Sequence, residues 1–343
     1  MTLDDPVQRT AARRDPALFI ETLGERAVID EIQYAPDLLP YLKMEVDKHR
    51  GRKGRYIMTG SQIFPVTAGL SESLAGRIAV FELLGFSWSE LGIRPADRTG
   101  AGCFRRLHDG FYPDPAVQGV NPSLFFGSYL ATCLERDIRQ IRAVHDLTLF
   151  QSFLEILAGR CGALLDMSQV ARDCGVSHTV ARQWLSLLEA TRLVILLRPF
   201  HRNVTKRVIK TPKLYFTDTG LLAYLLKYPD AQTLLAGPMA GAFFENMVIL
   251  EQLKRRFHRA SADQMYFYRD SNGNEADLII DRGRTMTVVE IKLSRSVRPV
   301  HAQGLLRLPG SLPVGERILV SMTPEIFEIA RGVRAVPWWD FSR

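Results

Sequence analysis

The segment from Glu275 to Lys292, EADLIIDRGRTMTVVEIK, constrains the fold of this chain more than any other stretch. Two apolar runs flank the pair Gly283-Arg284, and glycine at the first position of a two-residue turn suits a type II′ β-hairpin. The sequence therefore predicts two antiparallel strands in which Arg282 pairs with Thr285. A longer turn would shift this pairing.

The predicted register brings acidic side chains of the two strands together. Asp277 lies opposite Glu290, Glu275 lies opposite Lys292, and opposite side chains have Cβ atoms roughly 5 Å apart on one face. Two carboxylates at that separation repel each other unless a cation or a shared proton lies between them. The pattern predicts either a cation site with Lys292 beside it or a surface lattice in which Glu275 pairs with Lys292 and Glu290 with an arginine.

Near the N-terminus, apolar strands alternate with helices, as in a parallel α/β sheet. Residues 26–30, 55–62 and 77–87 are predicted to be buried strands, and residues 36–49 an amphipathic helix. Asp30 and Glu31 end the first strand, where such sheets place their sites. One carboxylate can hold Mg²⁺ through its waters, and its neighbour can orient a water against a γ-phosphate. A strand that ends in a solvated acidic turn would show the same pattern.

The stretches VIDEIQYAPDLL, GRYIMTGSQ and SESLAGRIAVFEL resemble a bacterial and archaeal family of AAA+-type ATP-binding proteins with an uncharacterised C-terminal domain. The later segments YLATCLERDIRQI, KLYFTDTGLLAYLL and FYRDSNGNEADLII resemble that family as well, so the resemblance covers nearly the whole chain. It implies a partial P-loop NTPase sheet that binds ATP with Mg²⁺, with Asp30 and Glu31 as catalytic residues. Thr59 and Ser61 would sense the nucleotide, and Arg77 would reach its phosphates.

The phosphate-binding loop of that family, G-x-x-x-x-G-K-[ST], is not found among the 29 residues before Asp30. The backbone amides and lysine of this loop neutralise the β- and γ-phosphates. We therefore expect the chain as printed to bind ATP poorly and to hydrolyse it negligibly. A start codon set too late, a trimmed chain and a degenerate gene copy all fit the absence.

Residues 164–215 resemble a winged helix-turn-helix. Ser168 and Ser177 suit the N-caps of two helices and Gly175 suits the turn between them, while residues 192–213 hold seven Lys or Arg and no acid. A local basic patch favours a polyanionic partner, here DNA; a winged helix that packs against protein, with its charges solvated, is the alternative. The residues predicted to contact DNA are His178, Thr179, Arg182, Arg202, Lys206, Arg207 and Lys210.

A predicted helix at residues 241–257 carries Glu245 and precedes the hairpin. The order of these elements resembles the PD-(D/E)XK nuclease fold, a restriction-endonuclease-like α/β domain. In that order a helix is followed by a hairpin with an aspartate and then by a Glu-x-Lys sequence. The resemblance implies that Asp277 and Glu290 bind Mg²⁺. It implies also that Lys292 supports the attacking water or the transition-state charge, and that Glu245 is an accessory acid. A nuclease fold kept without activity is the alternative.

The chain has 343 residues, which is long enough for two or three domains, and 46% of these residues are hydrophobic. The Gly-, Pro- and Arg-rich stretch at about 92–122 is expected to be irregular. The expected domains are a partial AAA+-like ATPase core at 1–92, a linker and helical lid at 93–160, a winged helix at 161–215 and a nuclease-like domain at 216–343.

The chain contains no apolar run long enough to span a membrane, no apolar leader and no C-x-x-C pair among its four cysteines. These features predict a cytoplasmic protein without a membrane partner. AAA+ relatives often form rings, so a homo-oligomer is possible by analogy. Three functions stay open: an ATPase-like protein with a DNA-associated C-terminal half, a metal-dependent DNA nuclease with an ATPase remnant, and a non-catalytic DNA- or protein-binding regulator.

Overall fold

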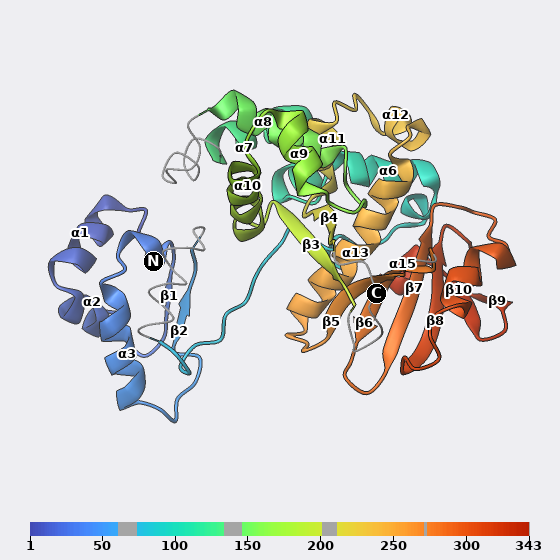
Figure 1. Cartoon of the computed structure of the whole chain (residues 1–343). Coiled ribbons are helices and arrows are strands. Elements are labelled where there is room, and N and C mark those ends of the chain that lie inside the picture. The colour runs from blue at the N-terminus through green and yellow to red at the C-terminus, as the bar shows by residue number, and fades with distance from the viewer. Residues whose placement is uncertain (61–73, 134–145, 201–210, 271–272, 343) are drawn as a thin grey trace. The chain divides into compact units, whose positions relative to one another are not determined.

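A computed structural model describes residues 1–60, 74–133, 146–200, 211–270 and 273–342 of the chain. The chain divides into two compact units, an N-terminal unit (Met1–Phe81) and a C-terminal unit (Glu82–Arg343) (Figure 1). Each unit has its own hydrophobic core. The predicted positions that lie outside the described residues are Ser61, Arg202, Lys206, Arg207 and Lys210.

The N-terminal unit is built on two short parallel strands, β1 (Ala27–Ile29) and β2 (Tyr56–Met58). Their parallel pairing is the one that the alternation of strands and helices predicts. The described residues cover one face of this pair, where Ile29 is buried, while Val28 and Ile57 are exposed. The helices of the unit are α1 (Pro6–Arg14), α2 (Pro16–Thr22), the 3₁₀ turn η1 (Ile32–Tyr34) and α3 (Leu38–Lys48).

Residues 77–87, predicted as a third buried strand, form no strand. Val80, Phe81 and Leu83 are exposed, and the guanidinium of Arg77 forms an ion pair with Asp47 at 2.8 Å. A strand needs a neighbour whose backbone N–H and C=O groups pair with its own, and no described strand pairs with this stretch. The prediction was wrong because apolar content alone does not supply that neighbour.

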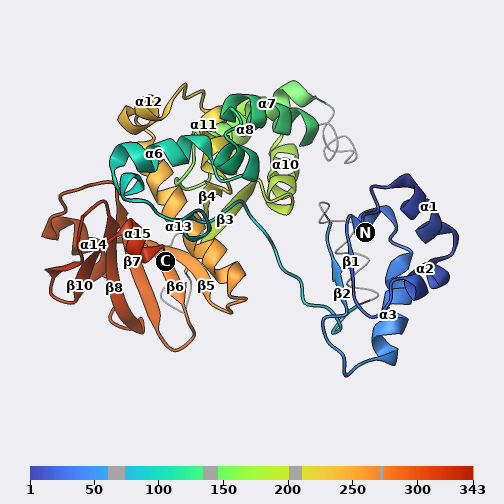
Figure 2. The ribbon, with the colours of Figure 1, turned by 180° about the vertical axis from the view of Figure 1, so that it is seen from behind.

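The C-terminal unit is organised around one eight-stranded mixed sheet, with the order β4-β3-β5-β6-β7-β8-β10-β9 (Figures 1 and 2). The strands are β3 (Val194–Pro199), β4 (Lys213–Phe216), β5 (Gln264–Arg269), β6 (Glu275–Asp281), β7 (Met286–Lys292), β8 (Val314–Ser321), β9 (Phe327–Ala330) and β10 (Val333–Pro337). The longer helices are α6 (Gly100–Asp109), α7 (Pro122–Cys133), α8 (Leu147–Ala158), α9 (Met167–Cys174), α10 (His178–Ala190) and α13 (Ala240–His258). The shorter helices and turns are α5 (Trp88–Leu91), η2 (Pro95–Arg98), η3 (Asp114–Gln118), α11 (Thr219–Leu225), α12 (Ala231–Ala236), η5 (Pro299–Ala302), α14 (Gln303–Leu306) and α15 (Trp338–Phe341).

The middle of this sheet follows a simple order along the chain. Helix α13 leads into the antiparallel meander β5-β6-β7, and α14 then leads to β8, which runs parallel to β7. On the other side, β3 runs antiparallel to β4 and parallel to β5. Strands from the expected winged-helix segment and strands from the expected nuclease-like segment therefore share one sheet.

Both faces of the central strands are buried, because successive side chains point to opposite faces. Leu278 and Val289 belong to the core that contains Phe244 of α13, whereas Ile279 belongs to the core that contains Leu305 of α14. This arrangement explains why the strands read as nearly continuous apolar runs instead of alternating ones.

The stretch expected to be irregular contains α6. Thr99 caps this helix by accepting a hydrogen bond from the Gly102 N–H at 3.1 Å, and Phe104 and Leu107 are buried on one side of it. A Cβ atom at Gly102 would lie 2.0 Å from the carbonyl oxygen of Ala96, so this glycine allows close packing. The expectation that this stretch is irregular was wrong at α6.

The two helices predicted for the helix-turn-helix are present as α9 and α10. Ser177 caps α10 by accepting from the Val180 N–H at 3.2 Å, as predicted. Gly175 ends α9 with a φ of +73°, a backbone conformation that favours glycine. The cap of α9 is Asp166 and not Ser168, because the Asp166 carboxylate accepts from the first free N–H groups of that helix.

Candidate functional site

The hairpin of β6 and β7 has the register that its turn predicts. Arg282 donates its N–H to the carbonyl oxygen of Thr285 at 3.0 Å, and Leu278 pairs with Val289 further along the strands. Gly283 has a φ of +82°, as the first position of a type II′ turn requires. One oxygen of Asp277 accepts the backbone N–H of Ile291 at 2.8 Å, which fixes this carboxylate against β7.

Lys213, the first residue of β4, lies among three carboxylates. Its Nζ is 2.7 Å from Glu275 Oε1, 3.2 Å from Glu245 Oε1 and 3.4 Å from Asp277 Oδ1. The lysine is only 4% exposed. An ammonium group has three donors and here meets three carboxylate oxygens, so its hydrogen-bonding capacity is matched. Sequence reasoning missed this residue.

Glu245 and Glu290 complete what we call the acidic cluster, made of Glu245, Glu275, Asp277 and Glu290. The Tyr215 hydroxyl donates to Glu245 at 2.6 Å. Lys292 forms an ion pair with Glu290 Oε1 at 2.7 Å. The other oxygen, Glu290 Oε2, is buried and has no hydrogen-bond partner among the described residues.

The salt-bridge lattice predicted as an alternative has different partners in the structure. Glu275 pairs with Lys213 and with Arg269, the latter at 3.5 Å. Lys292 pairs with Glu290 and not with Glu275. The sequence therefore predicted the residues of the cluster better than it predicted their pairing.

Burial and mutual repulsion dominate the electrostatics of the acidic cluster. Burial, together with the negative charge of Asp277, raises the pKa of Glu245 to about 7 and that of Glu290 to about 7. Burial alone would lower the pKa of Lys213, but the surrounding carboxylates outweigh it and hold the pKa above its ordinary value. Lys213 thus stays charged, while two of the acids hold protons more tightly than usual.

A bound cation would relieve this repulsion. In the described part of the chain, no three His, Cys, Asp or Glu side chains are grouped so that they could hold a metal ion. Magnesium does not require such a group, since proteins usually hold it by one or two carboxylates, waters and substrate phosphates. Asp277 and the buried, unpartnered oxygen of Glu290 are donors of that type.

The N-terminal unit brings three of the predicted nucleotide-related residues together. The Thr59 hydroxyl donates to Asp30 Oδ1, and this hydrogen bond lowers the pKa of Asp30. The backbone N–H of Glu31 lies 3.4 Å from the Thr59 oxygen, and Glu31 has a φ of +58°. Arg77 forms its ion pair with Asp47, not with these residues.

Helix α10 buries one side and exposes the other. Trp184, Leu185 and Leu188 are buried on one face of the helix. The predicted DNA-contacting residues of the helix, His178, Thr179 and Arg182, are all exposed. These side chains lie in its first turn and a half.

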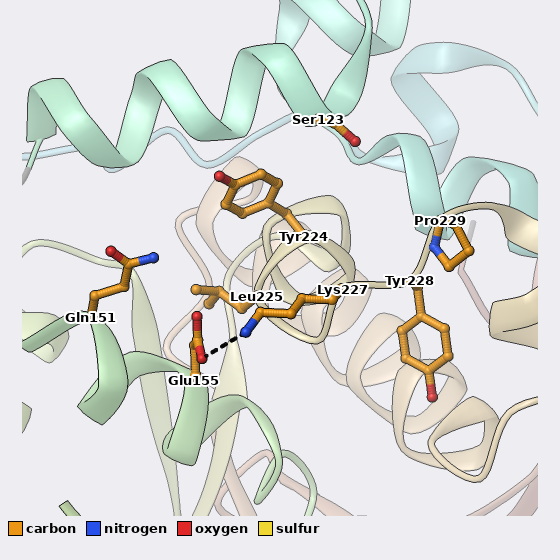
Figure 3. A pocket seen from close by; sticks show the side chains of 8 residues that line it. All are labelled: Ser123, Gln151, Glu155, Tyr224, Leu225, Lys227, Tyr228 and Pro229. Carbon is orange, nitrogen blue, oxygen red and sulfur yellow. Dashed lines mark hydrogen bonds and ion pairs between the residues drawn. The ribbon is translucent and has the colours of Figure 1, made fainter. Parts of the chain in front are cut away.

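A cavity of about 270 Å³ in the C-terminal unit is lined by none of the described residues that were predicted as site residues (Figure 3). It is lined by residues of α7, α8 and α11 and of the segment after α11. Lys227 forms an ion pair across it with Glu155 at 3.2 Å. The lining residues are Ser123, Gln151, Glu155, Tyr224, Leu225, Lys227, Tyr228 and Pro229.

Three family descriptions match successive parts of the chain. Residues 1–92 match the family described as an AAA domain. Residues 103–232 and 240–341 match two domains of unknown function, DUF8612 and DUF4143. Together with the fold, these matches support an AAA-type, ATPase-like class of protein, with nucleotide binding implied by family resemblance. Within the described ranges, no helix has both the length and the apolar character needed to cross a membrane.

Two uncharacterized proteins, Rv2008c of Mycobacterium tuberculosis and Mb2031c of Mycobacterium bovis, are 32% identical to the chain over 302 residues. The match covers 86% of this chain, which spans 66% of the length of each of these curated relatives. Among solved structures, protein VC1899 from Vibrio cholerae is 13% identical, with 98% of this chain and 78% of that chain covered. Its TM-score of 0.23 is too low to define a shared fold.

Proposed function

We propose that this chain is an ATPase-like protein whose C-terminal unit binds DNA and hydrolyses its phosphodiester bonds with Mg²⁺. One observation carries the proposal: α13, β6 and β7 bring Glu245, Asp277 and Glu290 together beside Lys292, and one buried oxygen of Glu290 has no hydrogen-bond partner among the described residues. The succession of α13, meander, α14 and parallel strand supports the nuclease-like resemblance.

Asp277 and Glu290 would hold the ion, since Mg²⁺ prefers carboxylate oxygens. When bound, Mg²⁺ would polarise the scissile phosphate and lower the pKa of a coordinated water. The Lys292 ammonium, 42% exposed at its side chain, would stabilise negative charge on the phosphate. Its ion pair with Glu290 keeps the ammonium close to the ligand oxygens.

The first test is cleavage of supercoiled plasmid with MgCl₂ or MnCl₂, and with EDTA in place of the metal. The wild-type chain should nick the plasmid only with metal, and Lys292→Ala should slow nicking by about 100-fold or more, because it removes a transition-state charge contact. Lys227→Ala is the matched control, since Lys227 is also an ion-paired lysine of the C-terminal unit. Plasmid that stays intact with wild-type protein and either metal would sink the proposal.

A second candidate function is DNA binding without cleavage. It is favoured by Lys213, whose ammonium already neutralises part of the acidic cluster. In that case the exposed residues of α10 would carry the function, and the cluster would be structural.

The two functions share one prediction about α10. Arg182→Ala should weaken binding to duplex DNA and reduce the slope of log affinity against log salt by about one, because one phosphate contact is lost. Fluorescence anisotropy of a labelled duplex over a salt series measures both quantities. Arg172→Ala, at an exposed arginine of α9, is the control. An unchanged affinity and slope for Arg182→Ala would rule out this surface.

A further inference from the structure

Lys213 differs from an ordinary surface lysine in its burial and in its partners. Its side chain is 5% exposed, and the Nζ approaches Glu245, Glu275 and Asp277 at once. The ring of Phe267 lies below the ammonium, with its centroid 5.6 Å away. A lysine is rarely buried unless it is paired, and here three carboxylates surround it.

The three contacts are unequal. Glu275 is closest at 2.7 Å, whereas Asp277 is farthest at 3.4 Å. Lys213 can therefore give up Asp277 while it keeps Glu275. Asp277 is also the carboxylate whose other oxygen accepts the Ile291 N–H, so the aspartate is held in place against β7 independently of Lys213.

We propose that Lys213 is an internal counter-ion that competes with a divalent cation for Asp277 and so sets the metal affinity of the acidic cluster. The inference rests on the proposed function in one respect, the role of Asp277 as a metal ligand. Lys213 is a positioning residue: without metal it holds the carboxylates together, and with metal bound it would retain Glu275. Two positive charges a few ångström apart repel strongly inside a protein, so each disfavours the other at Asp277.

The test is Mn²⁺ binding to Lys213→Met, measured by isothermal titration calorimetry after chelation of residual metal. Methionine keeps the length of the apolar stem and removes the charge. Mn²⁺ should bind Lys213→Met at least about tenfold more tightly than wild type. Lys213→Arg keeps the charge and should retain weak binding, and Lys213→Met with Asp277→Asn should lose the gain.

Lys254→Met is the matched control for loss of a buried lysine. Lys254 is 1% exposed and pairs with Glu251 at 3.1 Å, outside the acidic cluster. Its replacement should lower thermal stability without changing Mn²⁺ affinity. If Lys213→Met folds only in the presence of Mn²⁺, the metal replaces the lost charge and the proposal is supported.

Lys213→Gln, which keeps a hydrogen-bond donor, provides a second uncharged variant. The proposal would be overturned if the Mn²⁺ isotherms of Lys213→Met and Lys213→Gln match that of wild type. It would also be overturned by a loss of fold that Mn²⁺ does not restore in either variant. Tighter Mn²⁺ binding in Lys213→Met together with uncut plasmid would sink the nuclease function and leave the competition standing. Plasmid cleavage by the wild-type chain together with unchanged Mn²⁺ affinity in the variants would support the nuclease function and overturn the competition between Lys213 and the metal.

Discussion

Glu290→Gln should stabilise the C-terminal unit at pH 8 and at the same time abolish the proposed Mg²⁺-dependent cleavage. The folded chain raises the pKa of Glu290 from 4.5 to about 7. The folded state thus binds this proton more tightly than the unfolded state, so stability falls as pH rises from about 4.5 to about 7. Above that range the ionised Glu290 carboxylate lowers the free energy of unfolding by its full amount, on the order of 2–3 kcal/mol.

Glutamine has the same shape and no charge, so it avoids this cost. We expect Glu290→Gln to gain about 2–3 kcal/mol at pH 8 and little at pH 4, where Glu290 is protonated in the folded state and largely so in the unfolded state. Cleavage should fall by at least about 100-fold, because a neutral amide is a poor Mg²⁺ ligand. The raised pKa of Lys213 does not enter this window, since its ammonium stays charged throughout.

Urea unfolding followed by tryptophan fluorescence measures the stability of this unit alone, because all four tryptophans lie in it. Glu316→Gln is the matched control. Its carboxylate pairs with Arg334 at 2.9 Å and is 49% exposed, so its loss should change stability by less than about 0.5 kcal/mol. A Glu290→Gln protein no more stable than wild type at pH 8 would contradict the electrostatic account, and one that still cleaves would exclude Glu290 as a ligand.

Asp218→Ala should destabilise the C-terminal unit by about 2–3 kcal/mol. Asp218 is 1% exposed and caps α11 by accepting from the N–H groups of Gly220 and Leu221 at 2.8 and 3.1 Å. Its second oxygen accepts from the Phe111 N–H at 2.8 Å, so alanine would leave that buried donor without a partner. Burial raises the pKa of Asp218, and removal of the costly charge offsets part of the loss.

Asp166→Ala distinguishes the stability that Asp218 contributes as a helix cap from the stability that it contributes through its buried contact with Phe111. Asp166 caps α9 in the same way, through the N–H groups of Ser168 and Gln169, but it is exposed, and among the described residues only these local N–H groups donate to its carboxylate. Its loss should cost about 1 kcal/mol. Equal unfolding free energies for Asp218→Ala and Asp166→Ala, again measured by urea unfolding, would show that the Phe111 contact contributes nothing.

The hairpin could be predicted from the sequence because its information is local. The glycine at its turn sets which residues face each other, and the register follows without knowledge of the rest of the chain. The capping role of Ser177 was predictable for the same reason. Asp166 and Ser168 are both good capping residues, so the choice between them depended on where the backbone enters the helix.

Lys213 could not be predicted in the same way. It lies 62 residues before Glu275 along the chain, on a strand that is joined to the sheet of the acidic cluster through the pairing of β3 with both β4 and β5. Non-local pairing of this kind has no short-range signature. The wrong prediction of a third strand at residues 77–87 has a related cause. An apolar run becomes a strand only where another strand is available to pair with it.

The shared sheet of the C-terminal unit has a consequence for dissecting this protein. A fragment that begins at residue 216, where the sequence suggests a new domain, would lack β3 and β4. Its strand β5 would then have a free edge open to pairing with other chains, and its acidic cluster would lack the ammonium of Lys213. Such a fragment would be prone to aggregate and, at neutral pH, weakened by its own charge. Gene truncations meant to isolate the acidic cluster with its sheet should therefore begin before β3, not after β4.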